Sequence, residues 1–293
     1  MELYKDKIQK AIIGEFYNID TIINEDCDLY DNTTGELIFS FKKKIIADNF
    51  YNIDAKIIKH AGGLSYNRGS ATGTVTAQGL RRGMEKWTKK PEMPCDKEGN
   101  PLPEDHKKHT SYFKYEDGRI SKRQRSNSVA SQSIGGFDAS PMYPCRLTYW
   151  TKANLEPYKT IFPLCKDISE KYFSYCPEKW LSQYDKYEKC PQDFVIPDTN
   201  FSTLTINMDF RTAAHQDKGD AKCGLTAFTV KKCGEYRGGE LCFPEYNIGL
   251  NICQGDLLLF NPHQAHCNNP IVGKGRMSMV LYLREKMDQC ENE

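Results

Sequence analysis

The sequence predicts an α+β fold, because two kinds of hydrophobic periodicity occupy different parts of the chain. Residues 195–285 hold short runs in which apolar and polar residues alternate, as in half-buried strands. Residues 153–190 carry apolar side chains at helical spacing. With 293 residues, 39% of them hydrophobic, the chain can bury a sizeable core as one large domain or two small ones. The formal net charge of +1 gives no overall preference for a polyanion.

Residues 1–90 are expected to flank this core with strands and short helices. Residues 1–60 alternate apolar and polar positions, as in GELIFSFKKKIIADNF, which predicts strands and one short helix. Residues 62–73, GGLSYNRGSATG, are too rich in Gly and Ser for a regular element, so a loop is expected. Residues 79–90, GLRRGMEKWTKK, predict a short basic helix or a continuation of that loop.

Residues 91–140 predict a long, flexible, basic and Ser-rich insertion. They begin with a polar, Pro-rich stretch and contain GRISKRQRSNSVASQSIGG. Between residues 81 and 125 there are 13 Lys or Arg against 8 Asp or Glu, a local net charge of +5. The Ser-rich segment 126–133 either becomes ordered on binding a partner or is a mobile loop, and the sequence leaves both open.

Residues 141–194 are expected to form helices that brace the core. Pro163 and Pro177 are expected to interrupt them. The apolar positions at helical spacing are Leu155, Tyr158, Ile161, Phe162, Leu164, Ile168, Tyr172 and Phe173.

The C-terminal strands predict a double-stranded β-helix, a relative of the jelly roll. Short strands separated by Gly or Pro turns are typical of that architecture. We therefore expect residues 195–285 to be the core of a single domain spanning residues 1–293. The runs are FSTLTINMDF (201–210), GLTAFTV (224–230), GELCF (239–243), DLLLF (256–260) and MSMVLYL (277–283).

The 12 cysteines predict an intracellular protein with reduced thiols. No two have Cys-x-x-Cys spacing, which argues against a structural zinc site. The N-terminus does not resemble a signal peptide, and no stretch is apolar for about 18 residues, so no membrane partner is expected. In a eukaryote the expected compartment would be the nucleus. The alternative, in which some cysteines are paired, stays open.

His215, Asp217 and His266 are the candidate metal ligands and catalytic centre. Residues i and i+2 of a strand share a face, so His215 and Asp217 can point to one site. Two imidazoles and one carboxylate occupy one face of a metal and leave the other open, as in non-haem Fe(II) oxygenases. Arg276, ten residues after His266, can pair with a carboxylate of a bound diacid through two parallel hydrogen bonds, and Ser278 shares its face.

Other interpretations of these residues remain open. They can be surface side chains with Arg276 in an ordinary salt bridge. His263 competes with His266 as third ligand, although the ten-residue step to Arg276 favours His266. Two His and one carboxylate can also hold zinc in a hydrolase, but Arg276 has no role in that scheme.

The constellation resembles the 2-oxoglutarate/Fe(II)-dependent dioxygenases over about residues 195–284. Within that superfamily it looks most like the TET/JBP branch, which oxidises the methyl group of 5-methylpyrimidines in DNA. The motifs that carry the resemblance are FSTLTINMDFRTAAHQDKGD, YRGGELCFPEYNIGLNICQGDLLLFNPHQAHCNNP and GRMSMVLYLRE, with YNRGSATG upstream.

The resemblance implies Fe(II), 2-oxoglutarate and O₂ as cofactor and co-substrates. His215, Asp217 and His266 match the iron ligands. Arg276, with Ser278 beside it, matches the residue that binds the distal carboxylate of 2-oxoglutarate. Asn207 and Arg211 are candidate contacts to the other end of that co-substrate, each with a structural role as the alternative.

DNA is the partner that the resemblance implies, with the target base flipped out of the duplex because a stacked base hides its methyl group. Backbone contacts would come from basic residues near the pocket. Each of these residues can equally be solvated surface. The candidates are Arg68, Arg81, Arg82, Lys86, Lys89, Lys90, Lys122, Arg123 and Arg125, with Tyr66, Trp87 and Phe137 as possible stacking residues.

Two alternative functions stay open. The same chemistry could act on protein, as in a prolyl- or lysyl-type hydroxylase, or on RNA or a small molecule. A non-catalytic jelly-roll binding module with a vestigial metal triad is the alternative from another class, and the intact triad with Arg276 argues against it.

Overall fold

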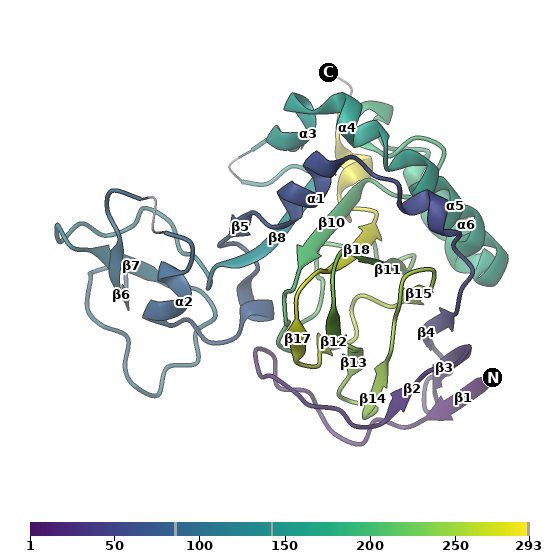
Figure 1. Cartoon of the computed structure of the whole chain (residues 1–293), viewed down its shortest axis with the longest axis horizontal. Helices are drawn as coiled ribbons and strands as arrows, with labels where there is room; N and C mark the ends of the chain where they lie inside the picture. The colour runs from purple at the N-terminus through teal and green to yellow at the C-terminus, as the bar shows by residue number, and fades with distance from the viewer. Residues whose placement is uncertain (85–86, 142, 292–293) are drawn as a thin grey trace.

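A computed structural model describes residues 1–84, 87–141 and 143–291. Among them, two β-sheets face each other and helices cover the outer side of the larger one (Figure 1). The major sheet has the strand order β1-β3-β4-β15-β11-β18-β10-β8-β5, and β9 pairs with β8. Its strands are β1 (Glu2–Lys5), β3 (Cys27–Asp31), β4 (Leu37–Lys42), β5 (Leu64–Ser65), β8 (Val129–Phe137), β9 (Arg146–Leu147), β10 (Thr203–Met208), β11 (Thr226–Lys232), β15 (Leu257–Phe260) and β18 (Arg276–Tyr282).

The minor sheet has the order β16-β13-β14-β2 and packs on the inner face of the major sheet. Phe39 on β4 stacks on Phe243 of β13 with ring centroids 5.1 Å apart. This closed pair of sheets confirms the predicted jelly-roll core of an α+β protein. The remaining strands of this part are β2 (Ile22–Ile23), β13 (Leu241–Phe243), β14 (Ile248–Leu250) and β16 (Cys267–Asn268), with β12 (Tyr236–Gly238) and β17 (Ile271–Gly273) paired to each other.

The two faces of strand β18 have different roles, one in the hydrophobic core and one toward the cavity. Its side chains alternate between the two faces. Met277, Met279 and Leu281 are fully buried in the main hydrophobic cluster, which also contains Leu164 and Ile168 of helix α5. The opposite face of β18 carries Arg276, Ser278, Val280 and Tyr282. The outer face therefore stabilises the fold, which leaves the inner face for a site.

Four of the helices, α3 to α6, lie within residues 141–194, for which bracing helices were predicted. Pro163 and Pro177 fall in the first turns of α5 and α6, where a missing N–H costs no helical hydrogen bond. The two prolines thus begin helices. The helices are α1 (Ala55–Ala61), α2 (Ala77–Arg81), α3 (Tyr149–Ala153), α4 (Leu155–Lys159), α5 (Phe162–Tyr175) and α6 (Pro177–Tyr187), with 3₁₀ turns η1 (Asp48–Tyr51), η2 (Gly69–Thr72), η3 (Gln192–Phe194) and η4 (Met287–Gln289).

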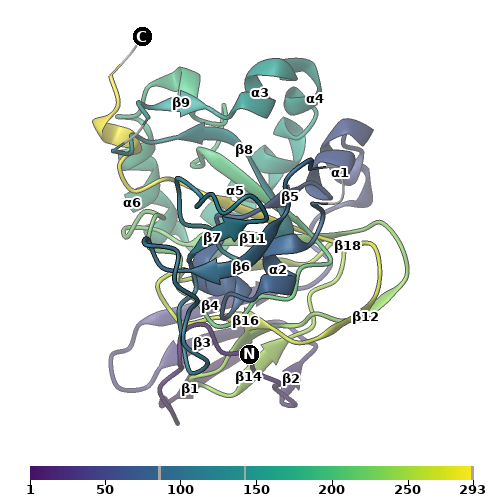
Figure 2. The same ribbon diagram turned by 90° about the vertical axis from the view of Figure 1, so that its left-hand side faces the viewer.

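Residues 74–84 and 87–126 form a separate lobe beside the two sheets (Figures 1 and 2). The lobe contains α2 and the antiparallel pair β6 (Pro91–Cys95) and β7 (Tyr112–Tyr115). Val75, Leu80 and Phe113 form its fully buried core. This part of the predicted insertion is thus a folded unit.

The prediction that residues 91–140 form one flexible insertion is wrong for the Ser-rich segment. Val129–Phe137 is strand β8, which pairs with β10 from Ser131 to Gly135. Side chains of the run V-A-S-Q-S-I alternate between the two faces of the sheet. Its serines face the interior of the molecule, where Ser131 and Ser133 form hydrogen bonds with side chains of β10. The serines that suggested a mobile loop therefore belong to a strand, and they lie beside a polar site.

The prediction that all thiols are reduced is also wrong. Cys145 and Cys290 form a disulfide, and the other ten cysteines are free. No helix in the described part of the chain is long and apolar enough to cross a membrane.

Candidate active site

His215, Asp217 and His266 come together through a bridge between segments far apart in the sequence. His266 directly precedes β16, and His215 follows β10. The backbone N–H of each histidine donates to the carbonyl of the other at 3.0 Å. The N–H of Asp217 donates to the carbonyl of Pro262 at 2.9 Å, so the same turn holds the third residue.

The three side chains fit a single metal ion. Nδ1 of His215 lies 2.8 Å from the carbonyl of Ala213, and Nδ1 of His266 lies 2.9 Å from that of Gln264. A carbonyl only accepts, so each Nδ1 carries the proton and each Nε2 presents a lone pair. These Nε2 atoms lie 3.8 and 3.4 Å from the carboxylate oxygens of Asp217. One ligand atom from each residue lies within 4.8 Å of the others, which suits an Fe(II) centre with open positions.

The local electrostatics favour the ligand forms of His215 and Asp217, whereas the carboxylate of Asp217 outweighs burial and raises the pKa of His266. Burial lowers the pKa of His215 to about 4, and the charge of His266 adds to this shift. Burial opposes ionisation of Asp217, but the two neighbouring imidazoles and the charge of Arg68 bring the pKa of its carboxyl below the usual range. At neutral pH, His215 is thus neutral and Asp217 is an anion.

The three ligands open onto a cavity of about 340 Å³. Its floor is a row of polar side chains from the adjacent strands β8, β10 and β18. The hydroxyl of Ser131 donates to Oδ1 of Asn207, and Nδ2 of Asn207 donates to the hydroxyl of Ser278 at 3.1 Å. In the next row, the hydroxyls of Ser133 and Thr205 lie 2.8 Å apart. Asn207 and Ser278 therefore line the cavity as part of one hydrogen-bonded network.

Arg276 has the features expected of a residue that binds an anion. It is only 3% exposed, and its Nη2 is buried with no hydrogen-bond partner among the described residues. Its backbone N–H donates to Oδ1 of Asp209 at 2.8 Å. Gly239, with φ of 79°, makes room for it, because a Cβ there would lie 2.8 Å from Cδ of Arg276. A buried guanidinium with a free N–H fits a carboxylate ligand.

Two other arginines do not lie where the sequence suggested. Arg211 donates from Nη2 to Asn18 Oδ1 at 2.8 Å and holds the N-terminal segment, so it does not join the cavity. Arg68, expected at a nucleic-acid surface, instead lines the cavity and donates from Nη2 to Ser133 at 3.0 Å. Its Nε is buried without a partner among the described residues. Arg68 is thus a second cation available to an anionic ligand of the metal.

Three further cavity residues were missed by the sequence analysis. Tyr282 lies six residues after Arg276 on β18, which corresponds to about 20 Å along a strand. Its hydroxyl lies 3.0 Å from Thr205 Oγ1. Near it, Asp220 accepts from Thr226 Oγ1 at 2.8 Å, and Arg284 also lines the cavity. Burial and the charge of Asp217 raise the pKa of Asp220 well above its usual value. The period-2 pattern of β18 was a signal that could have identified Tyr282.

The predicted nucleic-acid residues divide into two groups. Arg81 donates to the carbonyls of Pro91 and Glu92 at 2.8 and 2.7 Å, so it stabilises the lobe. Arg125 also has a structural position, over the rings of Tyr66, Trp87 and Phe113. Lys86 lies outside the described residues. The other candidates are exposed, although Lys89 pairs with Asp117 and Arg123 donates to the hydroxyl of Tyr143; they are Arg82, Lys89, Lys90, Lys122 and Arg123.

Comparison with known proteins finds relatives that match about half of this chain. Thymine dioxygenase JBP1 of Trypanosoma brucei brucei is 32% identical over 157 residues, which are 50% of this chain and 18% of that protein. Thymine dioxygenase JBP1 of Leishmania infantum is 33% identical over 171 residues, 55% of this chain and 20% of that protein. The chain thus spans about a fifth of the length of these curated relatives.

A solved structure shares the fold. NgTET1 in complex with 5mC DNA superposes with a TM-score of 0.55 at 10% identity, covering 100% of this chain and 87% of that one. Residues 138–285 match the sequence model of the Tet_JBP family, described as the oxygenase domain of the 2OGFeDO superfamily. The match covers half of the chain and contains the triad and Arg276. This chain therefore belongs to the Tet_JBP family of 2-oxoglutarate- and Fe(II)-dependent dioxygenase domains.

Proposed function

We propose that this domain oxidises the methyl group of 5-methylpyrimidine bases in DNA. The observation that carries the proposal is a cavity with a facial His-Asp-His triad and, on the same side of β18, a buried guanidinium with an unpaired N–H. Relatives that match about half of the chain are thymine dioxygenases, which supports a 5-methylpyrimidine as substrate.

Arg276 and Arg68, each with a buried N–H that has no partner among the described residues, mark where 2-oxoglutarate would bind. Arg276 and Ser278 would hold the distal carboxylate. Arg68, whose charge acts on Asp217, would face the carboxylate nearer the metal. Bound Fe(II), with 2-oxoglutarate and O₂, supplies the oxidising chemistry that breaks the methyl C–H bond. The residues of the chain fix the position of both ends of the co-substrate.

The flipped base would occupy the other end of the cavity. There the ring of Tyr282 offers a face for stacking, Asp220 a carboxyl group, and Arg284 a donor. A pyrimidine presents both donors and acceptors on its Watson–Crick edge, so a carboxyl and a guanidinium can both be satisfied. This arrangement accommodates 5-methylcytosine and thymine, and both are substrates to test.

Phosphate contacts would come from the exposed basic residues of the lobe. Arg82, Lys122 and Arg123 carry unburied charges on it. Such contacts are independent of sequence and weaken with salt. The lobe would thus position the duplex and the cavity would select the base.

The test is mass spectrometry of nucleosides after incubating the protein with Fe(II), 2-oxoglutarate, ascorbate and duplex DNA containing thymine and 5-methylcytosine. We expect hydroxymethyl, formyl or carboxyl derivatives of one or both bases, and none with Asp217→Ala. Succinate formation with unchanged DNA would overturn DNA as substrate and direct the search to RNA, protein or small molecules.

A further inference from the structure

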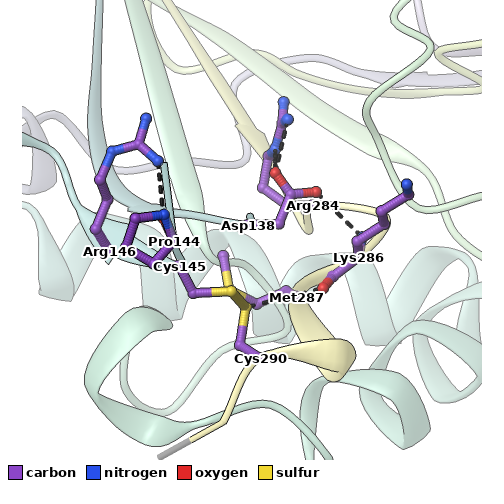
Figure 3. Close-up of a disulfide and its surroundings, with 8 residues drawn as sticks. All are labelled: Asp138, Pro144, Cys145, Arg146, Arg284, Lys286, Met287 and Cys290. Atoms are coloured by element: carbon purple, nitrogen blue, oxygen red, sulfur yellow. Dashed lines mark hydrogen bonds and ion pairs between the residues drawn. A yellow bond between two sulfur atoms is a disulfide. The ribbon is translucent and has the colours of Figure 1, made fainter. Parts of the chain in front are cut away.

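Two segments next to the cavity are fastened to each other at two points (Figure 3). One segment follows β8 and contains Asp138 and Cys145. The other is the C-terminal stretch from Arg284 to Cys290. The Cys145–Cys290 disulfide joins them across 145 residues of sequence. An ion pair between Asp138 and Arg284 joins them a second time.

The ion pair is a close and well-shielded one. Nε and Nη2 of Arg284 donate to Oδ1 of Asp138 at 2.9 and 2.8 Å. The other oxygen, Oδ2, accepts from the backbone N–H of Lys286 at 3.2 Å. Asp138 is only 6% exposed, so water competes little for these bonds. The carboxylate of Asp138 therefore fixes both the side chain of Arg284 and the backbone that follows it.

Arg284, which forms the ion pair with Asp138, also lines the cavity. Its guanidinium packs on Gly219, where a Cβ would lie 2.8 Å from Nη1. The backbones on either side are also joined, because the N–H of Ala221 donates to the carbonyl of Leu283 and that of Glu285 to the carbonyl of Gly219, both at 2.9 Å. The segment that follows Asp217 is thus held against Arg284.

We propose that Asp138 and the Cys145–Cys290 disulfide are positioning elements for Arg284, and that the disulfide makes base binding sensitive to thiols. This inference rests on the proposed function, in which Arg284 faces the base. Asp138 touches no substrate. It sets the direction of the guanidinium, and the disulfide prevents the two segments from separating.

Reduction has a defined chemistry and consequence. A dithiol transfers two electrons and two protons to the disulfide, which becomes two thiols, while the dithiol becomes its own disulfide. The chain from Arg284 to Cys290 is then held beside Asp138 only by non-covalent contacts. Because the disulfide no longer limits the separated states, the ion pair opens more often.

The first experiment measures steady-state DNA oxidation by the full chain with Asp138→Asn. We expect KM for DNA to rise about tenfold, the size of one lost charge-assisted hydrogen bond. KM for 2-oxoglutarate and the rate of succinate formation without DNA should stay unchanged. The matched control is Asp28→Asn, which removes the ion pair with Lys42 on the opposite part of the major sheet. Equal effects of both variants on KM for DNA would overturn the positioning role.

The second experiment compares wild type with Cys145→Ser/Cys290→Ser, each with and without dithiothreitol. We expect the reductant to raise KM for DNA about threefold in wild type, and the double variant to show the raised KM without responding to reductant. The control is Cys233→Ser/Cys253→Ser, which removes two exposed free thiols and should behave as wild type. A thiol response that persists in Cys145→Ser/Cys290→Ser would overturn the redox part.

These outcomes are distinguishable from failure of the proposed function. If DNA is not a substrate, no variant oxidises it, although all of them form succinate. If DNA is a substrate and the positioning role is wrong, DNA oxidation proceeds with the same KM in wild type and Asp138→Asn.

Discussion

The two ends of the cavity differ in how far the protein satisfies its own polar groups. At the iron end, each histidine presents a free Nε2. Arg276 lies behind the cavity lining, on the face of β18 that carries Ser278, and its buried Nη2 has no partner among the described residues. At the other end, Arg284 is paired with Asp138, and Asp220 accepts from Thr226. The polar groups of the iron end therefore need ligands to complete their hydrogen bonds. The polar groups of the other end are already paired within the protein, so this end would bind a base through the positions of its side chains.

This contrast predicts different kinds of failure. Changes at the iron end should impair both DNA oxidation and the decarboxylation of 2-oxoglutarate that we expect without DNA. Changes at the base end should spare that reaction and affect only DNA oxidation.

The largest effect is expected for Asp217→Ala. It removes the only carboxylate of the triad, so both succinate formation and DNA oxidation should fall to background, with an unchanged circular-dichroism spectrum. Glu235→Ala, which removes an exposed carboxylate, is the control. Retained succinate formation in Asp217→Ala would refute the ligand assignment.

Arg276→Ala should come next. Loss of a buried bidentate partner should raise KM for 2-oxoglutarate by about 30- to 100-fold. Arg276→Lys should recover only part of the loss, because an ammonium group cannot reproduce the paired geometry. Arg237→Ala, an exposed arginine on β12, should leave KM unchanged. An unchanged KM in Arg276→Ala would assign the distal carboxylate to another residue, with Arg68 the first to test.

Asp220→Asn tests the base end. We expect DNA oxidation to fall about tenfold, since one hydrogen-bonding group facing the base changes. Succinate formation without DNA should be preserved. A parallel loss of both reactions would mean that Asp220 acts on the metal ligands and that the two ends are not separable.

The smallest effect concerns a buried carboxylate remote from the cavity. The hydrogen bond from Tyr246 lowers the pKa of Asp31, and the backbone N–H of Thr34 adds to it. Because the pKa of Asp31 is lower in the folded state than in the unfolded state, where it is about 3.9, the ionised carboxylate stabilises the fold at higher pH. This stabilisation is lost as the pH falls through the folded-state pKa. Melting temperatures of Asp31→Asn should therefore lie below wild type at neutral pH and converge with it in acid. A constant difference across pH would contradict this linkage.

The same contrast explains what the sequence could predict. The iron end follows from local patterns, because His215 and Asp217 are two residues apart and Arg276 begins a strand with clear alternation. The strands of the core were predictable for the same reason. The helix starts at Pro163 and Pro177 were mistaken for interruptions, since proline is compatible with the first turn of a helix as well as with its end.

The rest of the cavity, including Arg68 near the metal and Arg284 at the base end, depends on long-range pairing that periodicity does not encode. Arg68 reaches the cavity because its loop lies beside Ser133, and Arg284 because the segment that follows β18 passes Asp138. Serines in β8 suggested mobility because their partners, Asn207 and Thr205, are more than 70 residues away. The Cys145–Cys290 pair likewise joins residues 145 positions apart.

The two ends of the lobe lie close together, because the side chain of Asn127 at one end binds the backbone of residues 72–76 at the other. Nδ2 of Asn127 donates to the carbonyls of Thr72 and Thr74 at 3.0 and 2.8 Å, and its Oδ1 accepts from the N–H of Thr76 at 3.0 Å. The chain therefore departs and returns at nearly the same place. The lobe is thus an insertion with neighbouring ends, although its His109 packs on Gly14, whose N–H donates to the carbonyl of Ala214 beside His215. New target preferences could be acquired there by recombination, provided that this contact beside the triad is kept.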